Sequence, residues 1–180
     1  MRWEGLFADL EGQLDAEARR ELDSEVAERT RRERALVDLL ARLGAARGQR
    51  LGLVLVGGRS VDGVLRDLGD GWLLLGDPAR ETLVPLGAVA AASGLAGHAE
   101  EPRTARRFGL GYALRALARD RATVALDLTG GPPVVGTVDV VGADHLVLAE
   151  HPDGEPRRKE NVRRRLTVPF AALRAVESRH

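Results

Sequence analysis

An internal repeat constrains the fold of this chain more than any other feature. The segment 57–75 recurs as the segment 130–148 at a constant offset of 73 residues. Each copy contains a Gly-Gly pair, a further glycine and then an apolar run, and each later reaches a Val-Pro turn. That turn ends at Pro85 in the first copy and at Pro169 in the second, so the second copy carries 11 extra residues before it. Because solenoid repeats are about 20–50 residues long, this offset predicts two small domains instead.

Short Val- and Leu-rich runs separated by glycines predict five strands in each copy. The expected ranges are 50–57, 60–68, 71–76, 81–85 and 88–92 in the first copy, and 121–129, 133–142, 144–150, 162–168 and 173–177 in the second. Apolar residues three or four positions apart predict a helix over 6–43, with a break near 22–24, and a second helix over 104–119. We therefore expect a mainly β protein with helices (α+β), organised as an N-terminal helical segment at 1–48, a first five-stranded unit with its linker at 49–102, and a helix plus a second unit at 103–180.

Composition excludes several classes of protein. The chain has no cysteine, which removes disulfides, thiolate zinc sites and thiol catalysis. No apolar run approaches the ~18 residues of a membrane-spanning helix, and the first ten residues do not resemble a signal peptide. We expect a cytoplasmic protein.

No residue pattern predicts an enzyme. The four histidines, at positions 98, 145, 151 and 180, have no partner at helical spacing, so a metal site is not expected. The glycine-rich segments 57–58 and 129–133 lack the helix and lysine that follow in a phosphate-binding loop. No nucleophile lies beside a plausible base. We predict no catalytic site, no metal, no cofactor and no small-molecule substrate.

One cluster of basic residues is the candidate binding site. Six cations occur within nine positions, in the insertion of the second copy and the strand after it: Arg157, Arg158, Lys159, Arg163, Arg164 and Arg165. Such a cluster can dock several phosphates, which predicts nucleic-acid binding with a steep salt dependence. No aromatic residue within it can stack on a base, so the binding should be weakly sequence-selective. The structural alternative is a charged strand edge that prevents unwanted strand pairing.

Charge is distributed unevenly although the net charge is zero. Residues 1–102 carry 13 basic and 18 acidic side chains, whereas residues 103–180 carry 14 and 9. This asymmetry is compatible with an anionic partner for the second half, and equally with head-to-tail attraction between molecules.

The first copy resembles the first sequence motif of the Sm/LSm family, which has an SH3-like small β-barrel. The likeness rests on Gly58-Arg59-Ser60-Val61-Asp62-Gly63-Val64-Leu65-Arg66-Asp67 followed by Trp72-Leu73-Leu74-Leu75, and on the mid-strand Gly63 and Gly136, which suit a sharply bent strand. The layout is similar to an actinobacterial type of tandem protein. The resemblance implies two tandem Sm-like five-stranded barrels, each preceded by a helix, with an N-terminal helical extension.

The resemblance does not extend to the family's RNA-binding turns. RNA-binding members have an Asp-x-x-x-Asn turn and an Arg-Gly turn; here segment 67–71 lacks the asparagine, and both final turns are Val-Pro. We therefore predict a non-enzymatic assembly or adaptor protein that binds a protein partner or itself through tandem Sm-like barrels. One barrel edge is expected to pair with the other barrel. The alternative is weakly sequence-selective RNA or DNA binding through the basic second barrel.

Overall fold

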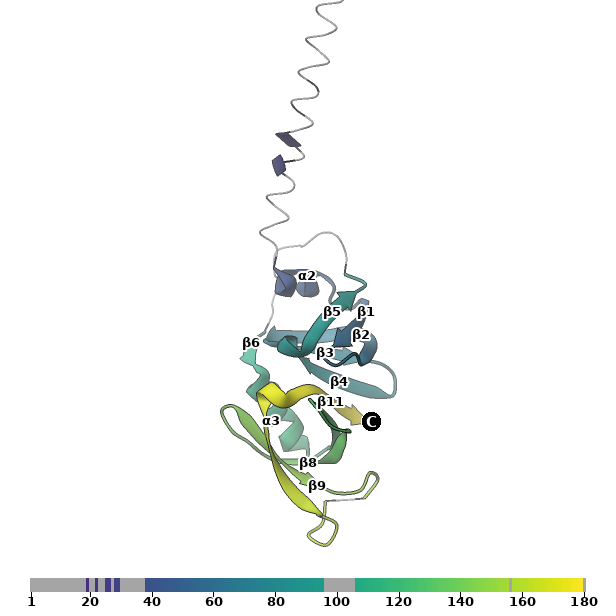
Figure 1. Cartoon of the computed structure of the whole chain (residues 1–180), viewed down its shortest axis with the longest axis vertical. Coiled ribbons are helices and arrows are strands. Elements are labelled where there is room, and N and C mark those ends of the chain that lie inside the picture. The colour runs from purple at the N-terminus through teal and green to yellow at the C-terminus, as the bar shows by residue number, and fades with distance from the viewer. Residues whose placement is uncertain are drawn as a thin grey trace, which may run out of the picture. The chain divides into compact units, whose positions relative to one another are not determined.

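The computed structural model describes residues 38–95, 106–155 and 157–179, together with Arg19, Leu22, Glu25, Val26, Glu28 and Arg29. The chain divides into two units, Met1–Leu39 and Leu40–His180 (Figure 1). The six separate residues of the first unit are helical. Most of the helix predicted over 6–43 lies outside the described residues, and its last part is α2 (Leu39–Ala45).

Two groups of five strands follow α2 along the chain. The first half of the sheet, a name used below for β1–β5, consists of β1 (Arg50–Leu55), β2 (Ser60–Asp70), β3 (Trp72–Gly76), β4 (Arg80–Pro85) and β5 (Val89–Ser93). The second half consists of β7 (Thr123–Leu128), β8 (Val134–Val141), β9 (His145–Glu150), β10 (Arg164–Pro169) and β11 (Leu173–Arg179). A single 3-10 turn, η1 (Leu86–Ala88) or η2 (Phe170–Ala172), follows each Val-Pro turn. The predicted strand ranges are correct to within two residues at every end.

The strands form one continuous sheet and not two barrels. In the described part of the chain the order is β10-β9-β8-β7-β11-β4-β3-β2-β1-β5, all antiparallel, with one further strand paired to β2. The prediction of two tandem Sm-like barrels, each preceded by a helix and with an N-terminal helical extension, is therefore wrong. The physical reason is the pairing of β4 with β11, in which Thr82 lies opposite Glu177. This ladder uses the edge at which each five-stranded unit would otherwise end.

The segment between the two halves also differs from the prediction. The helix expected over 104–119 is α3 (Leu110–Asp120), and the residues before it form β6 (Arg106–Gly109), which pairs in parallel with β2. Gly109 has extended backbone angles, φ −72° and ψ 173°. The indole Nε1 of Trp72 donates a hydrogen bond to the Phe108 carbonyl oxygen at 2.8 Å. Since that carbonyl is bonded to the sheet, it is not available to a helix, and α3 begins only after it.

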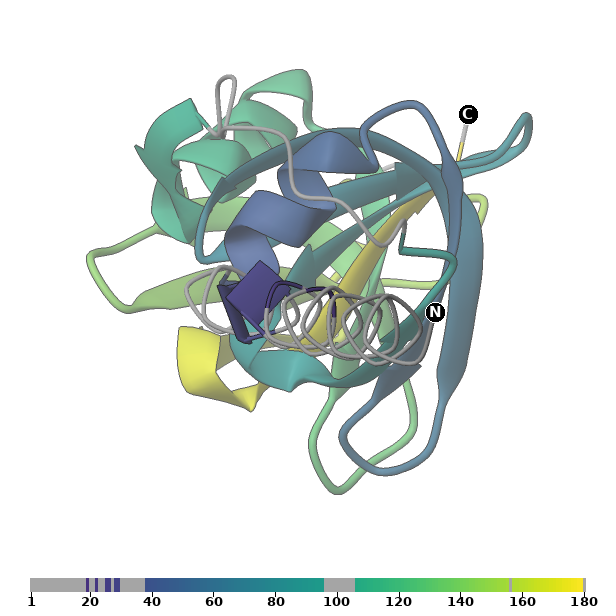
Figure 2. The ribbon, with the colours of Figure 1, turned by 90° about the horizontal axis from the view of Figure 1, so that it is seen from above.

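The sequence repeat reappears in the register of the ladders. The β2–β3 ladder shifts between Leu65 and Asp67, and the β8–β9 ladder shifts between Val138 and Val140, which are the same positions 73 residues later. A bulge of this kind bends a strand and increases its local twist. The strands are correspondingly curved (Figure 2). The two halves therefore bend at equivalent residues.

The mid-strand glycines of the repeat allow two strands to approach closely. A Cβ atom on Gly136 would lie 2.2 Å from the carbonyl oxygen of Ala149, and one on Gly63 would lie 3.0 Å from the Cβ of Leu75. A backbone atom cannot move aside as the end of a flexible side chain can. Glycine is thus required at Gly136 by the close approach of β8 and β9, whereas the sequence prediction rested on the bending of the strand.

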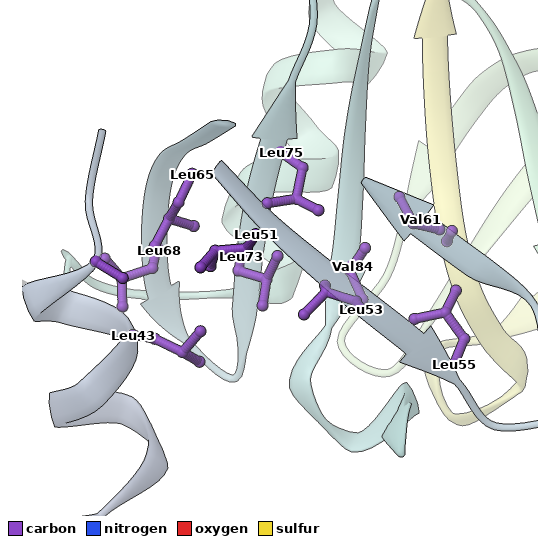
Figure 3. Close-up of a cluster of buried hydrophobic side chains, with 12 residues drawn as sticks. Leu43, Leu51, Leu53, Leu55, Val61, Leu65, Leu68, Leu73, Leu75 and Val84 are labelled. Carbon is purple, nitrogen blue, oxygen red and sulfur yellow. The ribbon is translucent and has the colours of Figure 1, made fainter. Parts of the chain in front are cut away.

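Each half of the sheet has its own hydrophobic cluster. In the first half, leucines and valines from α2 and from β1 to β4 point toward one another; they are Leu43, Leu51, Leu53, Leu55, Val61, Leu65, Leu68, Leu73, Leu75 and Val84 (Figure 3). The second cluster lies between α3 and β7–β11. Ala175 of β11 belongs to the first cluster, while Trp72 and Leu83 belong to the second. Each hydrophobic cluster therefore contains residues of the other half of the sheet, which are contributed next to the β4–β11 ladder.

Candidate functional site

A buried ionic network lies at the junction of the two halves. Asp127 on β7 is 2% exposed, and its Oδ1 accepts a hydrogen bond from Nη2 of Arg174 on β11 at 2.6 Å. Arg59, in the turn between β1 and β2, places its Nη1 3.1 Å from Oδ2 of Asp127. The same guanidinium also donates to Glu177 on β11. The turn of the first half is thereby connected to the last strand of the second.

The network is charged but not fully hydrogen-bonded. Within the described residues, Asp127 Oδ2 and Arg174 Nε are buried without a hydrogen-bond partner, since the approach of Arg59 to Oδ2 is an ion pair without hydrogen-bond alignment. Partial burial opposes the charge of Arg59, but the neighbouring carboxylates of Asp127 and Glu177 outweigh it and raise its pKa. Removing one member would leave a buried charge without its counterion, which is costly. We interpret this site as structural.

Three of the six predicted binding residues are occupied by acidic neighbours. Arg157 donates two hydrogen bonds to Asp139, from Nε at 2.5 Å and from Nη2 at 2.6 Å. The Nε of Arg165 lies 3.6 Å from the same carboxylate, and Arg164 pairs with Glu150. The hydrogen bonds from Arg157 hold the pKa of Asp139 below its usual value. These arginines therefore neutralise the protein's own carboxylates.

The other three predicted residues form the remaining basic surface. Arg158, Lys159 and Arg163 are exposed, and the described part of the chain shows no ion pair for their side chains. Arg158 and Lys159 lie in the loop between β9 and β10, and Arg163 immediately precedes β10. The structure thus divides the cluster into three paired arginines and three exposed cations close in sequence. The latter three are the residues with charge to offer an anion.

The two ends of the sheet differ in chemistry. β10 ends the described strand order on one side and carries the charged residues Arg164 and Arg165. β5 ends the order on the other side, and its sequence Val-Ala-Ala-Ala-Ser carries no charge. Ala91 in the middle of β5 is exposed. The uncharged edge is therefore the less protected one.

The described histidines have structural roles. The ring of His145 packs against Gly142 as the indole of Trp72 packs against Gly69, 73 residues earlier. His151 is buried, with its Nε2 2.9 Å from the Thr137 hydroxyl and its Nδ1 3.0 Å from the Pro152 carbonyl oxygen. The other two histidines, at 98 and 180, lie outside the described residues. Among the residues that are described, no group of three or more histidines and carboxylates could hold a metal ion.

Sequence reasoning missed the buried role of Asp127. The signal available was a carboxylate inside the apolar run of strand 123–128, where an unpaired charge is expensive and a partner must exist. Its partners are distant in sequence, so no spacing pattern identifies them. No protein-family model matches the chain, and no curated protein sequence matches it either. In the described part of the chain, no helix is long and apolar enough to cross a membrane.

Proposed function

We propose that this protein is a non-enzymatic assembly module of the cytoplasm, in which copies join through the two free edges of the sheet. The observation that supports the proposal is the ladder between β4 and β11. The Val-Pro turn at 85 connects β4 to β5, and the equivalent turn at 169 connects β10 to β11. In the repeat, β4 therefore corresponds to β10, and β5 corresponds to β11. The pairing of β4 with β11 within the chain therefore serves as a template for pairing of β10 in one copy with β5 in another.

The template specifies a register for the proposed contact. Within the chain, Leu83 lies opposite Val176 and Thr82 lies opposite Glu177. The 84-residue offset is added to the β4 residue to give its equivalent in β10, and it is subtracted from the β11 residue to give its equivalent in β5. The pair of Leu83 and Val176 thereby places Thr167 of one copy opposite Ala92 of the next. Leu166 then lies opposite Ser93. Each copy would continue the antiparallel sheet of its neighbour.

Burial at the two equivalent positions supports the edge contact. Ala175 of β11 is completely buried, since β4 covers its strand, whereas the equivalent Ala91 of β5 is exposed. Val54 and Val56, at the same end of the sheet, are 40% and 48% exposed. A second copy would cover this apolar surface. Because the two edges are different, the contact is head-to-tail and produces either a closed ring or a filament.

Cysteine cross-linking tests the register directly, because the natural chain has no cysteine. We expect the double variant Ala92→Cys with Thr167→Cys, or the neighbouring Ser93→Cys with Leu166→Cys, to form a ladder of covalent oligomers on oxidation. Both pairs are tested because adjacent antiparallel pairs alternate in Cα separation, and one spacing suits a disulfide better. The matched control, Ala92→Cys with Arg164→Cys, is out of register and should cross-link poorly.

Light scattering supplies the complementary measurement. The unmodified protein should be larger than a monomer, and Ala91→Lys should reduce its mass because a charge is placed on the uncharged edge. A monomeric unmodified protein that also forms no in-register cross-link would contradict the proposal. If a different protein pairs with β5 in place of a second copy, the protein is an adaptor that uses the same edge.

A second candidate function is weakly sequence-selective binding of RNA or DNA through the second half. The observation in its favour is the exposure of Arg158, Lys159 and Arg163, which carry charge that the described carboxylates do not neutralise. Pairing of the other three arginines reduces the number of phosphates such a surface can neutralise. Retention on heparin, described in the Discussion, tests this candidate.

A further inference from the structure

The turn between β1 and β2 lies against two strands of the second half, β7 and β11. Arg174 on β11 donates a hydrogen bond from Nη1 to the Val56 carbonyl oxygen of the turn, at 3.2 Å. Arg59 of the turn pairs with Asp127 on β7, at 3.1 Å, and with Glu177 on β11. The junction within the chain therefore has two parts, the β4–β11 ladder and this docked turn.

The ladder that receives the turn has a counterpart in the first half. Asp127 of β7 lies opposite Ala175 of β11, and the equivalent Val54 of β1 lies opposite the equivalent Ala91 of β5. Both ladders shift register next to these pairs, at equivalent positions. The β1–β5 ladder thus presents the same arrangement of strands as the β7–β11 ladder does, but without a turn docked on it from the described part of the chain.

The charged residues of the docked turn and of its receiving surface all have uncharged equivalents. Asp127, Arg174 and Glu177 correspond to Val54, Ala90 and Ser93, and Arg59 corresponds to Pro132. All four equivalents are exposed. Both partners of each ion pair are replaced together, so the second turn and the second surface remain matched in chemistry. We call Val54, Ala90 and Ser93 the Val54 surface.

We infer that the turn between β7 and β8 of one copy, residues 130–133, docks on the Val54 surface of the next copy. The inference rests on the proposed assembly function and adds a second contact to the pairing of β10 with β5. Pro132 takes the place of Arg59 and covers Val54, which is 40% exposed in the single chain. Pro132 and Pro133 restrict the backbone of the turn, which lowers the entropy lost when it docks.

The two kinds of junction also determine the order in which halves join. If β4 of one copy paired with β5 of another, Arg59 would meet Val54 and lose its counterion. If β10 paired with β11, Pro132 would cover Asp127 and leave that carboxylate without Arg59. A buried charge without its partner is costly, and such a cost disfavours the wrong partner. First and second halves therefore alternate, both within the chain and between copies.

Two single variants and their mixture test the docked turn. Val54→Asp places a carboxylate opposite a proline, and Pro132→Arg places a guanidinium opposite a valine. Sedimentation velocity should show each variant alone associating at least about ten-fold more weakly than the unmodified protein. An equimolar mixture should recover the affinity to within about three-fold, because one junction then repeats the Arg59–Asp127 pair and the other is unmodified.

The matched control is Val140→Asp, the same substitution at a residue of β8 that is 54% exposed and lies outside both proposed contacts. It should associate as the unmodified protein does. Melting temperatures show whether each variant is folded. If Val54→Asp does not fold, Ser93→Glu replaces it, because Ser93 is exposed and its equivalent Glu177 pairs with Arg59. Ser93→Glu should also associate weakly alone and recover when mixed with Pro132→Arg.

The results distinguish this inference from the proposed function. If cysteines at Ala92 and Thr167 cross-link but Val54→Asp and Pro132→Arg associate like the unmodified protein, copies pair by strands alone and the docked turn is refuted. Weak association of both variants without recovery in the mixture would also refute it, because the two residues would then act at separate places. A monomeric unmodified protein without in-register cross-links would refute the proposed function together with this inference.

Discussion

Arg59 and Asp127 form an ion pair, with 3.1 Å between Nη1 and Oδ2, that connects the β1–β2 turn of the first half to β7 of the second. Arg174 holds the other carboxylate oxygen of Asp127, at 2.6 Å. The carboxylate is almost fully buried, whereas the Arg59 side chain is 33% exposed. Loss of the carboxylate would therefore leave Arg174 with a charge that water reaches poorly.

Asp127→Asn should consequently be strongly destabilising. Removing one partner from a buried ion pair costs about 3–5 kcal/mol of unfolding free energy. Chemical denaturation measures this difference. The control is Arg80→Gln, which removes an ion pair to Asp77 at 3.0 Å on the surface and should cost much less. Similar losses for both variants would show that the buried network has no special role.

Gly136→Ala should destabilise the protein because the new methyl group would clash with the backbone. Its Cβ would lie 2.2 Å from the Ala149 carbonyl oxygen. Overpacking of this kind costs about 1–3 kcal/mol, and a backbone neighbour places the cost at the upper end. Gly131→Ala is the control, since a Cβ there meets no atom within 4 Å and the backbone angle is not left-handed. Thermal unfolding should separate the two; equal melting temperatures would contradict the close approach of β8 and β9.

The pair between Asp139 and Arg157 should contribute stability that depends on pH. The hydrogen bonds from Arg157 lower the pKa of Asp139 in the folded state below the ordinary value of 3.8. A lowered pKa gives stability that is fully present above the unfolded-state pKa and is lost as the pH falls through the folded-state value. The difference in unfolding free energy between the unmodified protein and Asp139→Asn should thus be constant above about pH 5 and shrink below 3.8.

Urea titrations across this pH range measure the effect. In an Arg157→Gln background, Asp139→Asn should change the acid dependence much less, because the group that lowers the pKa is gone. A difference that does not vary with pH in the unmodified background would mean that Asp139 has the same pKa in both states.

Heparin retention decides the nucleic-acid candidate. If the exposed cations bind phosphates, changing Arg158, Lys159 and Arg163 together to Ser should flatten the slope of log affinity for single-stranded RNA or DNA against log salt by about 0.7 for each phosphate that is no longer neutralised. Asp139→Asn should strengthen retention, since it releases Arg157 and Arg165 from their carboxylate. Absence of any retention of the unmodified protein at low salt would eliminate this function.

The matched control replaces the three paired arginines, Arg157, Arg164 and Arg165, by Ser. Because carboxylates of the protein already occupy these groups, this variant should reduce the slope less than the exposed-residue variant does. A larger reduction would place the binding surface on the edge strand itself.

Local features of the fold, and the expectation that the two five-stranded units pair through an edge, could be taken from the sequence, whereas the residues that lie opposite one another in that pairing could not. Glycine turns and apolar runs identify all ten strands of the repeat because hairpin chemistry lies between neighbours in the chain. The partner of an edge strand is not local, so nothing near Thr82 indicates that Glu177 lies opposite it. The start of α3 differs from the predicted one for the same reason, since a hydrogen bond from the distant Trp72 holds Phe108 in a strand.

The candidate sites also differ in whether their residues are neighbours in the sequence. The basic cluster can be found because its members are adjacent in sequence, but its pairing with Asp139 and Glu150 cannot. A groove between α3 and the sheet combines residues from β2, β3, β4, α3 and β11, each of which is ordinary in its own segment. Only folding brings these residues together.

The position of β11 between the halves has a consequence for synthesis. While the ribosome makes the second half, β4 is already complete and its partner strand does not yet exist. The nascent first half therefore exposes an unpaired strand edge until β11 emerges, and such edges recruit other chains. A chain interrupted after β10 would keep that edge permanently. Translation arrest or truncation before residue 173 should thus yield insoluble protein rather than a smaller soluble domain.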